Sequence, residues 1–165
     1  MDGKHQVLQE YFGYDAFRPG QGELIDALLA GRDAFGVMPT GGGKSLCYQV
    51  PALLLPGLTL VISPLISLMK DQVMALQNAG IPAGCIHSAM SVEELREAYR
   101  DTRFGAYKIL YIAPERLLTD GFCALAQELE ISLLAVDEAH CISQWGQDFR
   151  PGYLKIEEFL CTLPK

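Results

Sequence analysis

Three consecutive glycines followed by lysine and serine constrain this chain more than any other feature. Residues 38–45 read Met-Pro-Thr-Gly-Gly-Gly-Lys-Ser, after an apolar segment and before a segment of helical pattern. Glycines let the backbone curl so that its N–H groups converge on a polyphosphate at the start of a helix. We expect Lys44 to reach the β- and γ-phosphates and the Ser45 hydroxyl to bind Mg²⁺. The residues expected to surround the phosphates are Thr40, Gly41, Gly42, Gly43, Lys44 and Ser45.

Two adjacent acids follow a second apolar segment much further along the chain. Asp137 and Glu138 come directly after residues 133–136, Leu-Leu-Ala-Val, which are typical of a central strand buried on both faces. The carboxyl ends of strands are where α/β sheets bind their ligands. We expect Asp137 to hold Mg²⁺ and Glu138 to orient or deprotonate an attacking water, an arrangement suited to phosphoryl transfer.

Each of these motifs has a simpler explanation. Met38 stands at the first glycine position of the usual loop pattern, so a glycine-rich turn that binds nothing is the alternative for residues 38–45. Two adjacent acids are also common at a solvated strand end. The occurrence of both motifs in one chain favours a nucleotide-binding site over these two alternatives.

Composition limits the partners and the environment. The formal net charge is −7, which argues against non-specific nucleic-acid binding, so any such contact must be local. Five dispersed cysteines without a C-x-x-C pair favour reduced thiols in the cytosol over a disulfide framework or a zinc site. Residues 1–14 are polar and charged, unlike a signal peptide. Residues 45–69 carry no charge, but three prolines and Gly57 divide them, so we expect soluble core and no membrane span.

Strand and helix patterns alternate along the chain, which predicts one α/β unit with a mainly parallel sheet covered on both faces. An apolar stripe at residues 24–29 predicts a helix that ends at Gly31. Ser91 with Glu94 matches a capping box, and Gly80 is a helix stop. The expected strands are residues 34–38, 58–63, 83–87, 108–113 and 132–137, and the further expected helices are residues 45–54, 65–79, 91–102 and 122–130.

Together with these motifs, four further blocks resemble the RecQ family of DNA helicases, most closely the bacterial members, over nearly the whole chain. The first block, residues 12–21, reads Phe-Gly-Tyr-Asp-Ala-Phe-Arg-Pro-Gly-Gln and is similar to the family's adenine-reading motif. The Gln21 amide can pair bidentately with adenine, and Tyr14 and Arg18 would stack on or flank the base. A core role for Tyr14 is the alternative. The expected core anchors of this block are Phe12 and Phe17.

Two blocks resemble the family's motifs Ia and Ib. Residues 61–72 contain Ser63 and Pro64 at an expected strand-to-helix junction. Residues 111–117, which include Arg116, are expected to form a second junction of the same kind. Free N–H groups at such a junction can meet a DNA phosphate. A packed strand–helix turn without a ligand is the alternative for both.

The fourth block, residues 141–151, looks like the aromatic-rich loop by which this family senses single-stranded DNA and couples it to ATP hydrolysis. Trp145 and Phe149 offer faces for base stacking, worth about 1–3 kcal/mol per base, and Arg150 adds positive charge. A tryptophan that fills the core is the alternative. Gln147 stands where the family usually has histidine, which removes a titratable ring.

His140, the last residue of the Asp-Glu-Ala-His tetrad, tends in such motors to link the nucleotide site to neighbouring motifs. A structural histidine is the alternative.

The resemblance implies a RecA-like P-loop NTPase fold, a three-layer sandwich with a mainly parallel sheet. It implies ATP and Mg²⁺ as cofactors, single-stranded and partly duplex DNA as partners, and 3′-to-5′ unwinding in DNA repair and recombination. It also implies a bacterial cytoplasmic, nucleoid-associated protein.

Residues 1–165 would form part of the first RecA-like domain, ending before the motif III strand. The second RecA-like domain, which supplies an arginine finger, and the zinc-binding and winged-helix regions would be absent. We therefore expect marginal stability and little or no unwinding by this chain alone.

Two other functions stay open. One is a non-catalytic nucleotide-binding fragment or adaptor, which the short length and acidic balance favour. The other is a superfamily 2 motor that acts on RNA. The first would bind ATP without hydrolysing it even with a second motor domain present, and the second would respond to RNA in preference to DNA.

Overall fold

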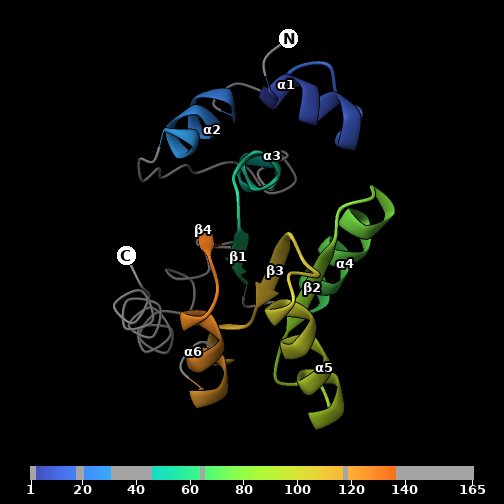
Figure 1. Ribbon diagram of the computed structural model, residues 1–165. Helices are drawn as coiled ribbons and strands as arrows, with labels where there is room; N and C mark the ends of the chain where they lie inside the picture. The colour runs from blue at the N-terminus through green and yellow to red at the C-terminus, as the bar shows by residue number, and fades with distance from the viewer. Residues whose placement is uncertain (1–2, 18–20, 31–45, 64–65, 117–118, 137–165) are drawn as a thin grey trace, which may run out of the picture.

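The computed structural model describes residues 3–17, 21–30, 46–63, 66–116 and 119–136 (Figure 1). The elements in chain order are α1 (Gly3–Val7), the π-helical turn η1 (Leu8–Phe12), α2 (Gln21–Leu29), α3 (Leu46–Leu54), β1 (Leu58–Ile62), α4 (Ile66–Asn78), β2 (Ala83–Ile86), α5 (Val92–Arg103), β3 (Ile109–Ile112), the 3₁₀ turn η2 (Pro114–Arg116), α6 (Asp120–Gln127) and β4 (Ile131–Val136).

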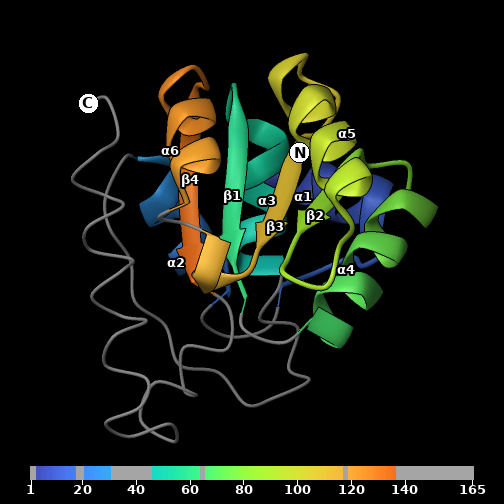
Figure 2. The same ribbon diagram turned by 90° about the horizontal axis from the view of Figure 1, so that it is seen from below.

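The four described strands form one parallel sheet in the order β2-β3-β1-β4, and Figure 2 shows them side by side in this order. Their last paired residues form one row across the sheet: Ile86, Ile112, Ile62 and Val136. The expected parallel α/β sheet is therefore confirmed. Within the part of the chain that the structure describes, β4 pairs with β1 alone, so its expected place as a central strand stays a prediction. The expected strand at residues 34–38 lies outside the described residues.

One face of the sheet packs against α5 and α6. Leu58, Leu60 and Ile62 of β1 point to this face, where they meet Ala98 of α5 and Phe122 of α6. All of these side chains are buried. The strands carry apolar residues on both faces, as expected of a parallel sheet covered by helices on each side.

The opposite face packs against α3 and α4. Val61 of β1 and Tyr111 of β3 lie in a second core cluster with Tyr48 of α3 and with Met69 and Leu76 of α4. The alternation of Leu60 with Val61 between the two clusters follows from the two-residue period of a strand. The molecule therefore has helix, sheet and helix layers.

A further helical layer lies beyond α3, as Figure 1 shows. Val7 of α1, Ile25 of α2 and Val50 of α3 are its buried centre, and the partly buried Phe12 and Phe17 pack against them. The expectation that Phe12 and Phe17 anchor the core is confirmed. The sequence pattern assigns no element to residues 3–12, where α1 and η1 form, because only two of their side chains are buried.

The local signals at the start and end of helices are confirmed at two positions. The Ser91 hydroxyl accepts a 3.1 Å hydrogen bond from the Glu94 N–H, and the Glu94 carboxylate accepts a 3.0 Å hydrogen bond from the Ser91 N–H. These bonds complete the capping box at the start of α5. Gly80 ends α4 with a left-handed φ of 86° that a side chain would oppose. Gly31 lies outside the described residues.

The last described helix begins and ends earlier than predicted. The expected range was residues 122–130, whereas α6 spans Asp120–Gln127. Glu130 lies beyond this helix, directly before β4, and its carbonyl accepts a 2.8 Å hydrogen bond from the Leu58 N–H. This hydrogen bond to the first residue of β1 ties the segment between α6 and β4 to the sheet.

Three of the five cysteines lie within the described residues. Cys47, Cys85 and Cys123 are partly buried, and burial raises the pKa of each thiol above its ordinary value. Cys141 and Cys161 lie outside the described residues. Among the helices that the structure describes, none is long and apolar enough to cross a bilayer.

Candidate functional site

The carboxyl ends of β1, β2 and β3 form one edge of the sheet. Ser63, His87 and Ala113 are the first residues beyond the last paired row of these strands. Asp137 follows β4 in the sequence, but it lies outside the described residues. Because parallel strands end at the same edge, the segments after them are brought together there, which is where α/β sheets bind ligands.

Ser63 is held tightly within this edge. It is 1% exposed, and its N–H donates a 3.0 Å hydrogen bond to the Ile112 carbonyl. The Ser63 amide is therefore used by the sheet, and a phosphate contact of Ser63 would have to use its hydroxyl. Pro64, the other expected DNA contact of this block, lies outside the described residues.

The loops after β2 and β3 are joined by one side-chain hydrogen bond. The Ser88 hydroxyl donates to Glu115 Oε1 over 2.9 Å. The next residue, Arg116, closes the 3₁₀ turn through its N–H, which donates to the Ala113 carbonyl over 3.0 Å. The Arg116 Nε is buried and has no hydrogen-bond partner among the described residues. A guanidinium with an unsatisfied donor beside this edge is suited to bind an anion.

His87 lies beneath the same loops as a core residue. It is 3% exposed, and its Nδ1 accepts a 3.2 Å hydrogen bond from the Ala89 N–H. Burial lowers the pKa of His87 below its ordinary value, and the positive charge of Lys70 lowers it further. The neutral ring therefore carries its proton on Nε2.

The helix after the expected phosphate loop carries polar groups into the core. The hydroxyls of Tyr48 and Tyr111 lie 2.9 Å apart. Gln49 Nε2 donates to the Tyr111 hydroxyl over 3.2 Å and to Gln72 Oε1 over 3.1 Å. Motif reasoning did not select Tyr48 or Gln49 as functional residues. Their signal in the sequence is polarity inside an otherwise apolar segment, which indicates a buried hydrogen-bond network.

The expected adenine-reading block is described in part. Gln21, the first residue of α2, is 1% exposed and makes interactions within the protein. Tyr14 is 55% exposed and follows Gly13, which has a left-handed φ of 75°. An exposed ring at Tyr14 is available for stacking, whereas the core alternative for Tyr14 does not fit its exposure. Roles for both residues in adenine binding stay predictions.

The remaining expected site residues lie outside the described residues. Within the described ranges, no group of three or more His, Cys, Asp or Glu side chains is placed to hold a metal ion. The residues whose roles stay predictions for this reason are Arg18, Thr40, Gly41, Gly42, Gly43, Lys44, Ser45, Asp137, Glu138, His140, Trp145, Gln147, Phe149 and Arg150.

Residues 18–164 match the sequence profile of DEAD/DEAH box helicases. The chain belongs to the DEAD/DEAH box helicase family. Within this family its similarity is to the RecQ helicases, which confirms the resemblance drawn from the motifs.

Over the aligned residues, this chain is about half identical to its curated relatives. It is 55% identical over 152 residues to "ATP-dependent DNA helicase RecQ" of Bacillus subtilis, which covers 92% of this chain and 26% of that protein. It is 51% identical over 158 residues to the protein of the same name from Haemophilus influenzae, covering 96% and 26% of the two chains. It is 47% identical over 157 residues to "ATP-dependent DNA helicase Q1" of Rattus norvegicus, covering 91% and 25%. The chain thus spans about a quarter of the length of these relatives.

Solved structures confirm the RecA-like helicase fold. The crystal structure of a hypothetical ATP-dependent RNA helicase from Sulfolobus tokodaii aligns with a TM-score of 0.75 at 22% identity, covering 98% of this chain and 47% of that chain. The DUF1998 helicase MrfA aligns with a TM-score of 0.68 at 18% identity, covering 96% and 27%. At these identities the likeness concerns the fold alone.

Proposed function

We propose that this chain is the ATP-binding part of the first motor domain of a RecQ-type, ATP-dependent DNA helicase. The observation that carries the proposal is the common edge formed by the carboxyl ends of the parallel strands. The motif Ia and Ib segments leave the sheet at this edge, and Asp137 and Glu138 follow β4 in the sequence. The names of the RecQ relatives support the assignment to ATP and DNA.

In this proposal the glycine-rich loop binds the ATP phosphates, with Lys44 at the β- and γ-phosphates. Ser45 and Asp137 would hold Mg²⁺, which neutralises charge on the phosphates. Glu138 orients or deprotonates the attacking water, and His140 links this site to neighbouring motifs. Tyr14, Arg18 and Gln21 bind the adenine. Oxygen donors such as a serine hydroxyl and a carboxylate are the ligand types that Mg²⁺ prefers.

DNA binding is assigned to segments on the same edge of the sheet. Arg116 is the described residue best suited to a phosphate, because its Nε is buried without a partner among the described residues. Ser63 and Pro64 would contribute from motif Ia, and the aromatic-rich loop would contribute Trp145, Phe149 and Arg150. The net charge of −7 requires such local contacts, because the summed charge of these 165 residues has the same sign as that of nucleic acid.

The whole protein would be a bacterial cytoplasmic enzyme associated with the nucleoid. It would move 3′ to 5′ along single-stranded DNA and unwind partly duplex DNA during repair and recombination. A second RecA-like domain would complete the ATP site with an arginine finger, which in related enzymes contributes about 10³–10⁵ in rate. Without such a domain, the 165-residue chain is expected to bind ATP weakly and to hydrolyse it poorly.

The first test is the binding of fluorescently labelled ATP with Mg²⁺, measured by anisotropy. Saturable binding that Lys44→Ala abolishes is expected, because Lys44 supplies the positive charge at the phosphates. Lys70→Ala is the matched control, since it removes an exposed lysine from α4. Equal binding by wild type and Lys44→Ala would overturn the assignment of the glycine loop.

A second test separates a DNA motor from an RNA motor or an adaptor. The chain would replace the matching segment of the Bacillus subtilis RecQ protein, and hydrolysis would be followed with single-stranded DNA or RNA. A DNA helicase predicts stimulation by DNA above that by RNA. Stronger stimulation by RNA would favour an RNA motor, and ATP binding without hydrolysis would favour an adaptor.

A further inference from the structure

A network of four polar side chains lies inside the core on the α3–α4 side of the sheet. Tyr111 is fully buried, Tyr48 is 7% exposed and Gln49 is 5% exposed. The two tyrosine rings meet edge to face, with centroids 6.2 Å apart. We call Tyr48, Gln49, Gln72 and Tyr111 the tyrosine–glutamine network.

The network joins elements that carry three different motifs. Tyr48 and Gln49 lie in the first turn of α3, directly after the glycine-rich loop. Gln72 lies on α4 and is the last residue of the motif Ia block, and Tyr111 lies one residue before the end of β3 and is the first residue of the motif Ib block. The hydrogen bonds therefore fix α3, which follows the glycine-rich loop in the sequence, against both elements that carry the expected DNA-binding blocks.

The Tyr111 hydroxyl is the centre of the network. It accepts a hydrogen bond from Gln49 Nε2, and it pairs with the Tyr48 hydroxyl, where either oxygen can be the donor. The Gln49 amide uses its two N–H groups on Tyr111 and Gln72. A small rotation of α3 would lengthen bonds to β3 and α4 together, and an unsatisfied polar group is costly at such burial.

We propose that Tyr111 is a positioning residue that couples ATP binding to DNA binding. The proposal rests on the function proposed above, because it concerns the two sites of that function. ATP acts on α3 through the glycine-rich loop, and the tyrosine–glutamine network transmits a shift of α3 to α4 and β3. DNA acts on α4 and β3 through the motif Ia and Ib blocks, and the same network transmits that shift to α3. Coupling of this kind is reciprocal, so ATP and DNA change each other's affinity by the same factor.

The test compares Tyr111→Phe with Tyr107→Phe in the 165-residue chain. Tyr111→Phe removes the central hydroxyl and keeps the ring. Tyr107→Phe makes the same chemical change four residues earlier, on the opposite face of the sheet, where Tyr107 packs with the α5–α6 cluster. The affinity for a non-hydrolysable ATP analogue is measured with and without saturating single-stranded DNA, and thermal unfolding is recorded for each variant. The ratio of the two affinities is the coupling factor, which in proteins is typically about 5- to 150-fold.

The expected result is a coupling factor that falls at least about threefold in Tyr111→Phe and is unchanged in Tyr107→Phe. ATP affinity without DNA should stay within about twofold of wild type, since Tyr111 is buried in the core and is none of the residues proposed to bind ATP. A purely structural role would lower the unfolding temperature of Tyr111→Phe and leave its coupling factor at the wild-type value, which would overturn the proposal. An equal loss in Tyr107→Phe would overturn it too.

Two further outcomes separate this inference from the proposed function. If wild type binds ATP and DNA without coupling, the function stands and the inference fails. If wild type binds neither, both fail for this chain. Should Tyr111→Phe not fold, Gln72→Met serves in its place, because Gln72 is only half-buried and the change removes one acceptor of the network. A wild-type coupling factor in folded Gln72→Met would then overturn the proposal.

Discussion

Ser88 and Glu115 hold together the loops that follow β2 and β3, through a 2.9 Å hydrogen bond from the Ser88 hydroxyl to the Glu115 carboxylate. Glu115 directly precedes Arg116, for which we propose a contact with a DNA phosphate. The hydrogen bond is exposed, so its contribution to the free energy of unfolding is small. Its effect should therefore be seen in binding, as a constraint on the position of the Arg116 loop.

Ser88→Ala should weaken single-stranded DNA binding by about two- to fivefold, because the loop loses one anchoring bond of about 0.5–1 kcal/mol. Glu115→Gln should not weaken binding, since its amide oxygen still accepts the bond and a negative charge near the phosphate is removed. Anisotropy titrations with labelled DNA at fixed salt measure both. Equal weakening by the two variants would contradict this account.

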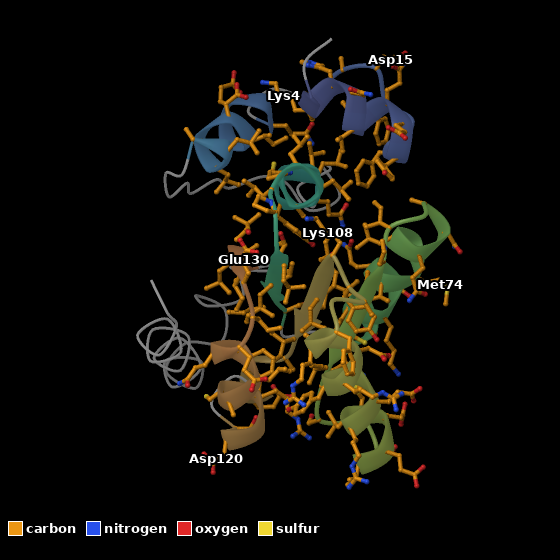
Figure 3. All side chains as sticks on the ribbon, in the orientation of Figure 1. Lys4, Asp15, Met74, Lys108, Asp120 and Glu130 are labelled. Carbon is orange, nitrogen blue, oxygen red and sulfur yellow. The ribbon has the colours of Figure 1, made fainter. Side chains whose placement is uncertain are left out.

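Lys108→Met should lower the free energy of unfolding by about 1.5–3 kcal/mol. Figure 3 shows Lys108 between α3 and the sheet, and its Nζ donates to the Leu55 carbonyl over 2.6 Å and to the Gly57 carbonyl over 3.1 Å. These carbonyls follow the end of α3, where a positive charge is favourable. Urea unfolding measures the change. Lys70→Met, at an exposed position, is the control and should stay within about 0.5 kcal/mol of wild type.

Gly84→Ala should destabilise the chain by about 1–3 kcal/mol, because a Cβ at this buried strand position would overlap the Tyr107 ring. Three ring atoms would lie 2.6, 2.7 and 2.8 Å from that Cβ. Combining Gly84→Ala with Tyr107→Ala should cost less than the sum of the two single changes. Gly22→Ala is the contrasting control: its Cβ would meet only Lys4 Nζ, at 3.8 Å, so the helix should gain up to about 1 kcal/mol. Additive losses in the double variant would refute the overlap.

Acid should destabilise the chain in two separate steps. The folded-state pKa of His87 lies below its ordinary 6.5, chiefly because the ring is buried. The positive charges of Lys70 and Arg116 lower this pKa further, whereas the negative charges of Glu94 and Glu115 raise it by less. The unfolded chain therefore binds the proton first, and stability falls as the pH drops from about 6.5 through the folded pKa. Hydrogen bonds from Ser91 lower the pKa of Glu94 below 4.5, so its contribution is present above 4.5 and lost as the pH falls further.

The variant that checks this assignment is His87→Asn, whose side-chain oxygen can replace Nδ1 as the acceptor of the Ala89 N–H. Urea midpoints at about pH 7.5 and about pH 5.5 should differ less in His87→Asn than in wild type. The step below pH 4.5 should persist in both. An unchanged first step in the variant would show that another group titrates there.

Much of this fold could be predicted because its signals are local. The apolar strands, the Ser91–Glu94 capping box and the stop at Gly80 each depend on neighbours within a few residues. All are confirmed except the expected strand at residues 34–38, which lies outside the described residues. The end of α6 could not be predicted, because the Glu130 carbonyl after it is hydrogen-bonded to Leu58 of β1, which lies far away in the sequence. The segment at residues 3–12 lacked an apolar stripe and gave no helical signal.

For the candidate site too, some features could be predicted from the sequence and others were decided only by the tertiary structure. Motif patterns alone selected the glycine-rich loop, the tetrad and Arg116, and with them the helicase family, because each motif is a short run of residue types with its own chemistry. Only the tertiary structure decided that Gln21 and Ser63 are buried, that Ser88 binds Glu115, and that β1 lies between β3 and β4. It alone also brought Tyr48 to Tyr111 across 63 residues of sequence. These contacts depend on the packing of α3 and α4 on one face of the sheet, and no local pattern encodes a distance between elements that meet only when the core forms.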